Sequence, residues 1–323
     1  RRPPRSTPKP SSAASDVYKR QTLAEPTEET AFLELHKKFN AANKPSSAML
    51  PIQRAALSRF EILGFPHSKH EMYTFVNTKG LVTTSFAVSN SSASIPEKFI
   101  SDNIYSGCET SCMVFVNGVF NPSLSSLKGI ESSVKISTIV ENEDTDRIVA
   151  TLKNENDVFA CLANAFCAEV IVVEIEGNTQ VPVPIQALFV STGDISTQSM
   201  HSPRLVWKVG NLAEVKVIEK SVGLHAGYFI NAAQDWLVEE NAGVVLTQVQ
   251  SDPFETWNFS KTRVNLKRNA RFHSSNSSTG SILVRHHFEA RLEEEGAELI
   301  LSLIHISEPT RRTPISYAVF CLK

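Results

Sequence analysis

Hydrophobic and polar positions repeat along the chain between Pro203 and Leu301. Four small-residue corners recur there, and their marker alanines are 29, 28 and 27 residues apart: Ala213, Ala242, Ala270 and Ala297. Each corner separates two strand-like runs, such as Leu205–Val209 before the first corner and Val215–Ile218 after it. A period of this length, with β-branched runs and polar corners, predicts the stacked coils of a β-solenoid. An antiparallel meander with similar turns is the alternative.

The residues at the corners fit close stacking of successive coils. Asn and Gly tolerate a positive φ at little steric cost, and one of them stands at each corner: Asn211, Asn241, Asn269 and Gly296. The neighbouring alanine leaves room for the next coil.

Upstream of the repeat, apolar residues follow helical spacing. Thr27 can cap a first helix, whose apolar face carries Phe32, Leu35 and Phe39. A second helix begins near Pro51, and Gly64 with Pro66 ends it. Its apolar face comprises Ile52, Ala56, Phe60 and Leu63.

The middle of the chain mixes several predicted elements. Asn117-Gly118 lies between two apolar runs and predicts a type I′ hairpin over 113–120. Residues 130–151 are acidic and Ser-rich, which indicates a surface connection. A helix over 157–166, which buries Phe159, Leu162 and Phe166, leads into strands at 170–175 and 183–190. The prolines at 182 and 184 favour an edge strand or the start of a strand.

The two ends differ in character from the rest. Residues 1–21 contain six basic residues, one acid and four prolines. Ser12–Gln21 and Leu301–Thr310 both resemble translated adapter DNA, and an Arg- and Ser-rich transit peptide is the other interpretation of the front. We therefore expect a mainly β fold in five segments: a non-native tail at 1–21, a small α-helical region at 22–75, a mixed α/β connection at 76–195, an incomplete β-helix core at 196–301 and a non-native tail at 302–323.

Composition narrows the possible functions. The chain has 323 residues, of which 41% are hydrophobic, and a net charge of −2, so no electrostatic feature suggests nucleic acid as a partner. No apolar run reaches the about 18 residues that a membrane-spanning helix needs. The cysteines, without a secretory signal, predict a reducing compartment and free thiols: Cys108, Cys112, Cys161, Cys167 and Cys321.

The cysteines do not form a metal-binding pattern. On a strand, Cys108 and Cys112 would lie about 13 Å apart, too far to share one ion. Cys161 and Cys167 face different directions on a helix. We expect buried, inert thiols.

Other candidate residues also have structural interpretations. His286 and His287 are adjacent on a predicted strand and point to opposite sides, so only one could share a face with His273. The aromatic residues Tyr228, Phe229 and Trp236 suit core packing better than a carbohydrate platform, and Glu293–Glu295 suits a solvated corner. No residue is assigned a catalytic, cofactor-binding or metal-binding role.

Short motifs in a fixed order resemble the SufB/SufD family of the SUF iron–sulfur cluster assembly system, and within it the SufD members. They run from Phe60–Pro66 with Lys69 and Glu71, through Val114–Phe120 with Leu124-Ser125, Leu162–Phe166, Val181-Pro182 and Pro184-Ile185, to Pro203–Leu205, Glu219, Asn231, Arg285 and Glu295–Leu299. The resemblance covers about Ile52 to Leu301. It departs at Tyr73, where the family usually has Trp.

The resemblance implies a right-handed parallel β-helix behind a helical N-terminal region. It implies a non-catalytic scaffold that pairs with a SufB-like subunit, docks a SufC-like ATPase and supports iron supply and cluster assembly. No cofactor would be bound by this chain alone, and iron or an iron–sulfur cluster would be transient in the complex. The expected location is the cytoplasm, or the plastid stroma if the front is a transit peptide.

Two features limit what can be carried over from the family. Residues 203–301 contain no cysteine, so a cluster built against them would need thiolates from a partner, with only His or carboxylate ligands from this chain. Family members continue past the equivalent of Leu301, into an important His and a helical SufC-binding segment. We therefore expect lost SufC contact and an aggregation-prone last coil in this chain.

Two other functions are compatible with a β-solenoid. A β-solenoid enzyme acting on polysaccharide would gather Asp, Lys or Arg side chains on one exposed face. A β-solenoid that serves only as a protein-binding module needs no such cluster.

Overall fold

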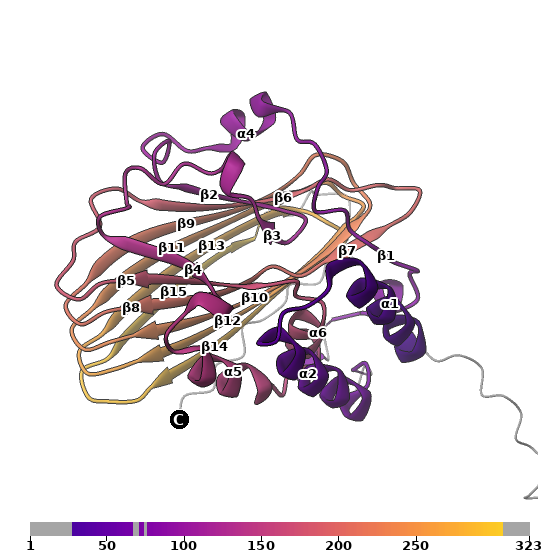
Figure 1. Cartoon of the computed structure of the whole chain (residues 1–323), viewed down its shortest axis with the longest axis horizontal. Coiled ribbons are helices and arrows are strands. Elements are labelled where there is room, and N and C mark those ends of the chain that lie inside the picture. The colour runs from indigo at the N-terminus through magenta and orange to yellow at the C-terminus, as the bar shows by residue number, and fades with distance from the viewer. Residues whose placement is uncertain (1–27, 67–70, 74–75, 306–323) are drawn as a thin grey trace, which may run out of the picture.

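The fold is a parallel β-helix whose one face is covered by helices (Figure 1). The computed structural model describes residues 28–66, 71–73 and 76–305. Strands stack into about four turns, as the sequence predicts, and form two sheets. We name these sheet A and sheet B.

Sheet A holds the strands that precede the predicted corners. Its strands are β1 (Ala87–Val88), β4 (Val134–Thr138), β5 (Val170–Ile175), β7 (Ser199–His201), β8 (Arg204–Val209), β10 (Tyr228–Val238), β12 (Thr256–Leu266) and β14 (Leu283–Leu292). Sheet B holds the strands that follow them. Its strands are β2 (Cys112–Val116), β3 (Val119–Phe120), β6 (Ile185–Ser191), β9 (Glu214–Gly223), β11 (Gly243–Asp252), β13 (Arg271–Gly280) and β15 (Glu298–His305).

The stacking register reproduces the period in the sequence. In sheet B, Glu214 lies beside Gly243, Gly243 beside Arg271, and Arg271 beside Glu298, which are the steps of 29, 28 and 27 residues. These strand pairs are parallel, so the antiparallel meander is wrong for this part of the chain. The hairpin of β2 and β3 is antiparallel, and Asn117 and Gly118 both have a positive φ, as predicted for type I′.

The corners stack through backbone hydrogen bonds. The N–H of Leu212 donates to the carbonyl of Glu240 at 3.0 Å, and that of Asn241 to Arg268 at 2.9 Å. Positive φ occurs at Asn241, Asn269 and Gly296 as expected, but at the first corner it falls on Leu212 instead of Asn211. The alanines of the first three corners are fully buried, which confirms their packing role.

The solenoid interior is apolar beside these corners. The indole rings of Trp207 and Trp236 stack with centroids 4.6 Å apart and planes 2° apart. Tyr228, Phe229 and Trp236 are all fully buried, so they do not form a carbohydrate platform. Farther along the strands the interior becomes polar, and Ser274, Asn276 and Ser278 of β13 are buried there.

A layer of helices covers the outer face of sheet A. The helices of the described residues are α1 (Glu28–Asn43), α2 (Met49–Leu63), α3 (Lys79–Val82), α4 (Glu97–Asn103), α5 (Thr145–Lys153) and α6 (Val158–Ala165), with short 3₁₀ turns η2 (Glu71–Tyr73), η3 (Pro122–Leu124) and η4 (Ile139–Glu141). α1, α2 and α6 share an aromatic core with the sheet, in which the rings of Phe159 and Phe259 lie 4.5 Å apart. α4 instead packs against sheet B, near β2 and β6.

Several local predictions need correction. Residues 130–151 do not form a loose surface connection, because they contain β4, η4 and most of α5 and bury Ile139 and Ile148. β6 begins at Ile185, after both prolines, and lies between β2 and β9, so the prolines mark a strand start and not an edge. α2 ends at Leu63 before a positive-φ Gly64, as predicted, but the Leu63 side chain is 38% exposed.

Some predicted features lie outside the described residues. These are the helix cap at Thr27, the motif residue Lys69, and the tail segments 1–21 and 306–323. Residues 302–305 are described and belong to β15. Among the described residues, no helix is both long and apolar enough to cross a membrane.

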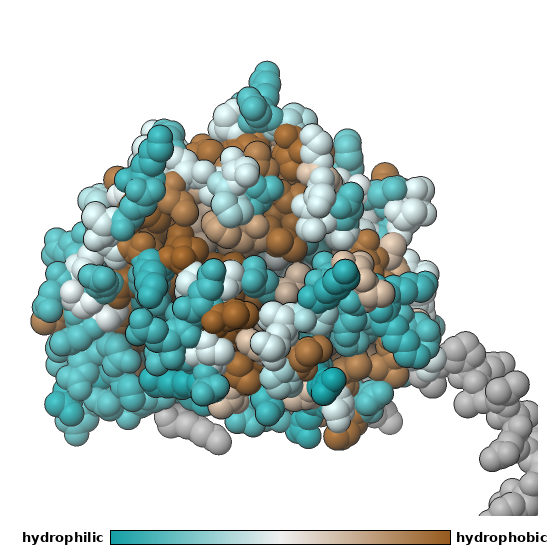
Figure 2. Space-filling model, viewed as in Figure 1, coloured by the Kyte–Doolittle hydropathy of each residue, from teal (hydrophilic) through white to brown (hydrophobic). Residues whose placement is uncertain are grey.

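Figure 2 shows how polarity is distributed over one face of the molecule. Hydrophilic side chains cover the side on which the predicted corners stack, at the left of the view. The corner at Glu293–Glu295 contributes to this surface through ion pairs with Lys267, at 2.7 Å from Glu293, and Arg268. The predicted solvated corner is therefore confirmed, with partners that the sequence did not reveal.

Candidate functional site

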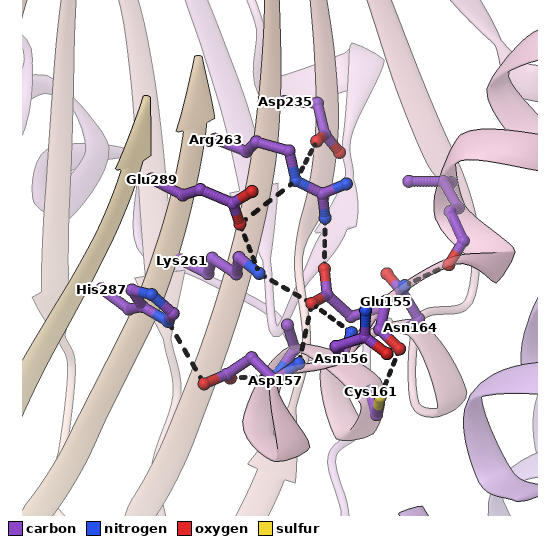
Figure 3. A network of polar contacts seen from close by, with 12 residues as sticks. Glu155, Asn156, Asp157, Cys161, Asn164, Asp235, Lys261, Arg263, His287 and Glu289 are labelled. Carbon is purple, nitrogen blue, oxygen red and sulfur yellow. Dashed lines mark hydrogen bonds and ion pairs between the residues drawn. The ribbon is translucent and has the colours of Figure 1, made fainter. Parts of the chain in front are cut away.

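A buried network of charged side chains joins the helical layer to the solenoid (Figure 3). Alternate residues of a strand point to the same side of a sheet, so the outward side chains of sheet A form rows across the strands. One row is Asp235, Arg263 and Glu289, which are in register on β10, β12 and β14. The row beside it contains Lys261 and His287. Carboxylates and cations thus alternate on this face.

The helical layer contributes the segment that leads into α6. Asp157 caps α6, since its Oδ1 accepts the N–H of Ala160 at 2.9 Å. The Glu155 side chain accepts the N–H groups of Asn156 and Asp157, at 2.8 and 2.9 Å. These local hydrogen bonds fix both carboxylates so that they face the sheet.

Glu155 connects the loop to β12. Its carboxylate accepts hydrogen bonds from Lys261 Nζ at 2.7 Å and from Arg263 Nη2. Lys261 also pairs with Glu289 at 3.2 Å, and Arg263 Nε lies 3.3 Å from Asp235. Burial would lower the pKa of Arg263, but Asp235 and Glu155 outweigh it and raise that pKa. Arg263 therefore keeps its charge although it is buried.

Asp157 connects the loop to β14. It accepts the Tyr73 hydroxyl at 3.0 Å and lies 3.2 Å from His287 Nδ1 and 3.7 Å from Arg285. Burial opposes the charge of Asp157, yet the His287 hydrogen bond and the Arg285 charge hold its pKa well below the usual range. The Arg285 guanidinium lies over the Tyr73 ring, 4.2 Å from its centroid. The aromatic residue at 73 thus packs against a cation.

Arg204 of β8 connects the network to α6. Its Nε donates to Asn164 Oδ1 of α6 at 2.9 Å, and its Nη2 donates to Asp235. Burial would raise the pKa of Asp235, but the charges of Arg204 and Arg263 lower it. Next to it, Asn231 Nδ2 donates to the Phe159 carbonyl at 2.8 Å.

Beside the network lies a cavity of about 300 Å³, which we call the α6 cleft. Its inner wall consists of Glu155, Asp157, Lys261, Arg263 and His287. The other residues that line it are Met72, Asn154, Asn156, Phe288, Glu289, Ala290 and Arg291. Among the described residues, His287 Nε2 has no hydrogen-bond partner, while Nδ1 faces Asp157. The cleft therefore combines fixed charges with one unoccupied ring nitrogen.

A second polar network lies inside the solenoid, around Glu219. The amide groups of Gln234 and Gln248 donate to Glu219 Oε2 at 3.0 and 2.8 Å. Glu219 is 7% exposed, its Oε1 has no partner among the described residues, and burial raises its pKa to about 7. Asn276 donates to Gln248 at 3.3 Å, which continues the network toward β13.

The described cysteines are all buried and free, as predicted. Burial raises the pKa of the Cys112, Cys161 and Cys167 thiols to about 12 and also raises that of Cys108. A thiolate is the form that binds metals, so these thiols are poor ligands as placed. Within the described part of the chain, no group of three or more His, Cys, Asp or Glu residues has a metal-binding arrangement.

The histidines are arranged differently from the prediction. His273 lies on β13 of sheet B, whereas His286 and His287 lie on β14 of sheet A, so neither joins His273 on a shared face. His286 points inward and contacts Ser260 and Ser278 at 2.5 and 2.9 Å. His287 points outward into the α6 cleft and meets Asp157, which is 130 residues away in the sequence, so no local pattern could predict this contact.

Two family models match the chain in consecutive segments. Residues 26–187 match the SufBD protein N-terminal region, and residues 189–320 match the SufBD core domain of SUF system FeS cluster assembly. The first segment alone spans half of the chain. The chain belongs to the SufBD family. The charged network therefore lies where the family's two regions meet, since Glu155 and Asp157 fall in the first and β12 and β14 in the second.

A curated relative supports the assignment to the SufBD family. The chain is 26% identical over 251 residues to a protein of Synechocystis sp. named iron–sulfur cluster assembly SufBD family protein. The aligned region covers 73% of this chain and 55% of that relative, so the chain spans about half the length of the protein it matches.

The structure also explains several of the residues that carried the resemblance. Arg204, Asn231 and Arg285 all belong to or adjoin the charged network, and Glu219 is the centre of the interior one. The sequence marked these residues as family motifs without indicating that they meet. Glu155, Lys261 and Arg263 were missed altogether, because separated charged residues in a strand or loop usually face solvent.

Proposed function

We propose that this protein is a SufD-type scaffold subunit of a SUF assembly complex. In this proposal it pairs with a SufB-like subunit in a complex that contains a SufC-like ATPase, and it supports iron supply and cluster assembly without catalysing a reaction itself. The observation that carries the proposal is the match to both SufBD regions in order along the chain. Its place of action would be a reducing compartment, the cytoplasm or a plastid stroma.

The chemistry of the thiols favours a supporting role over cluster binding. Iron–sulfur clusters are held mainly by Cys thiolates, and the four described thiols are buried with raised pKa values. The solenoid segment 203–301 contains no cysteine. We therefore infer that a cluster, as cargo of the complex, takes its thiolates from the SufB-like partner.

The polysaccharide-enzyme alternative has less support. Sugar-binding platforms use exposed aromatic faces, whereas Tyr228, Phe229 and Trp236 are fully buried. The clustered charges of sheet A are covered by α6 and paired with each other, so they do not form an exposed row.

Co-expression with SufB-like and SufC-like subunits from one organism tests the proposal. A tagged form of this protein should retain the SufB-like subunit through size-exclusion chromatography, together with the SufC-like ATPase that this subunit binds. Retention of neither subunit, under conditions in which SufB-like and SufC-like proteins still bind each other, would contradict it.

A further inference from the structure

We propose that Trp207 and Glu219 bind one buried water molecule inside the solenoid, and that this site responds to the protonation of Glu219. The inference goes beyond the assembly role and does not depend on it. It rests on two buried polar atoms without partners and on the register of the coils that brings them together.

The first of these atoms is the indole nitrogen of Trp207. Its N–H is fully buried and has no acceptor among the described residues. Trp236, one coil later, stacks on Trp207 with the ring planes 2° apart, and its own N–H donates to Gln234 at 3.0 Å. The residue of β8 in register with Gln234 is Leu205, whose side chain has no acceptor. Leucine in place of glutamine therefore explains why the Trp207 N–H lacks a protein partner.

The second atom is Oε1 of Glu219, which lies in the same coil as Trp207. Oε2 accepts hydrogen bonds from Gln234 and Gln248, which both belong to the following coil, whereas Oε1 is buried and has no partner among the described residues. Toward the preceding coil, Glu219 is in register with Ala187 of β6, whose methyl group leaves space beside Oε1. A water molecule there can accept from Trp207 and bond to Oε1, which gives both buried atoms a partner.

The protonation of Glu219 changes the hydrogen bonds of this water. Because Oε2 already accepts from two amide groups, the proton of the neutral acid lies on Oε1 and donates to the water. When Glu219 is ionised, the water instead donates to Oε1 in a charge-assisted bond, which polarises the water and strengthens its bond from Trp207. The Trp236 N–H donates to Gln234 in both forms.

Among the described residues, no other charged side chain contacts Glu219. Burial, and not a charged neighbour, raises the pKa of Glu219. On β9 itself, Lys216 and Lys220 alternate with Glu219 and point to the outer face. The titratable side chains that other strands turn toward the interior bond elsewhere: His201 to Ser191, Tyr228 to Asp252, and His286 to Ser260 and Ser278. The site therefore responds to the charge of Glu219 alone.

Nuclear magnetic resonance of the indole N–H groups in the full chain tests this site, because three tryptophans give three resonances. Between pH 5 and pH 8.5, the Trp207 N–H resonance should move downfield with a midpoint near 7. It should also show a nuclear Overhauser effect to water. Trp236 is the internal control, and its resonance should move much less.

Two variants separate this site from other effects of pH. Glu219→Gln should abolish the movement of the Trp207 resonance. Trp207→Phe keeps the stacked ring but removes the donor, so the fall of the unfolding free energy with pH should move up by about one pH unit, a tenfold change in the protonation equilibrium. Trp257→Phe is its matched control, since Trp257 packs in the core shared with the helices, and it should leave that midpoint unchanged.

Four outcomes would overturn the proposal. These are a Trp207 resonance that does not titrate, one that still titrates in Glu219→Gln, titration without an Overhauser effect to water, and equal movement of the Trp207 and Trp236 resonances. The last would indicate a general rearrangement of the interior. None of these outcomes bears on SufB-like binding, so the assembly role stands or falls separately.

Discussion

At the first corner of the solenoid, Leu212 adopts the left-handed backbone conformation that Asn241 and Asn269 adopt in the next coils. Its φ of 59° is costly for a residue with a branched side chain, by roughly 1–2 kcal/mol. The side chain is 49% exposed, so it contributes little burial in return.

Replacing this leucine should stabilise the protein. We expect Leu212→Asn to increase the free energy of unfolding by on the order of 0.5–1 kcal/mol, because Asn tolerates this conformation. Urea unfolding measures the change. Leu212→Ala keeps the strained backbone and should give no gain. An equal gain in the alanine variant would show that loss of the exposed side chain, and not the backbone, is responsible.

Glu219 makes stability depend on pH near neutrality. Burial raises its pKa from 4.5 to about 7 in the folded state. Between these values the unfolded chain loses the proton and the folded protein keeps it, so the free energy of unfolding falls as pH rises. The fall amounts to about 3 kcal/mol between pH 4.5 and 7 and levels off above the folded pKa.

The Glu219→Gln variant should remove this dependence. It keeps an acceptor for Gln234 and Gln248 but cannot ionise. Between pH 5 and pH 8, the free energy of unfolding of the variant should fall by about 3 kcal/mol less than that of the unsubstituted protein. Parallel stability curves for the two proteins would show that Glu219 ionises normally in the folded state.

At the scale of elements, the segment before α6 holds the helical layer on the solenoid. Glu155 is 4% exposed and pairs with Lys261 and Arg263, which are 7% and 6% exposed. Removal of one partner from a buried ion pair leaves a charge uncompensated, which costs far more than loss of a surface pair. This asymmetry gives a direct test of the junction.

We expect Glu155→Gln to lower the free energy of unfolding by about 3–5 kcal/mol. Glu214→Gln is the control, since Glu214 pairs with Arg271 on the surface, where a pair contributes about 0–1 kcal/mol. Limited proteolysis should cut the Glu155 variant first within the helical layer. Equal small losses in both variants would show that the network does not hold the junction.

The sequence predicted the strands and corners well where the type of each residue suits its place in the fold. The corners were recognisable because Asn, Gly and Ala recur with the period of the coils. β13 was only partly recognisable, because its inward positions Ser274, Asn276 and Ser278 are polar and bond within a polar interior. The prediction of a surface connection at 130–151 was wrong. Acidic and Ser residues dominate the composition of this segment and hid its few buried apolar positions, such as Ile139 and Ile148.

The candidate site could not be predicted in the same way. Glu155 and Arg263 are 108 positions apart, and neither lies in a motif with a known chemical role. Their meeting depends on how α6 docks on sheet A, which is a tertiary contact. Family motifs indicated Arg204, Asn231 and Arg285 but did not indicate what these residues contact.

At the scale of the whole molecule, the protein combines a SufBD-family fold with described thiols that are poorly placed for a cluster. The N-terminal and core regions meet at the buried network, which makes them one continuous body in the structure. A rigid solenoid covered on one face by helices is suited to hold partners in a fixed arrangement. An effect of this chain on cluster assembly would then be measurable only when those partners are present.

Cluster reconstitution with iron and sulfide tests this central claim most directly. We expect this protein alone to retain no stable cluster after desalting, as measured by visible absorption and iron content. Added to SufB-like and SufC-like subunits with ATP, it should increase the amount of cluster that the complex assembles. A stable cluster on this chain alone, or assembly by the partners that is the same with and without it, would contradict the account.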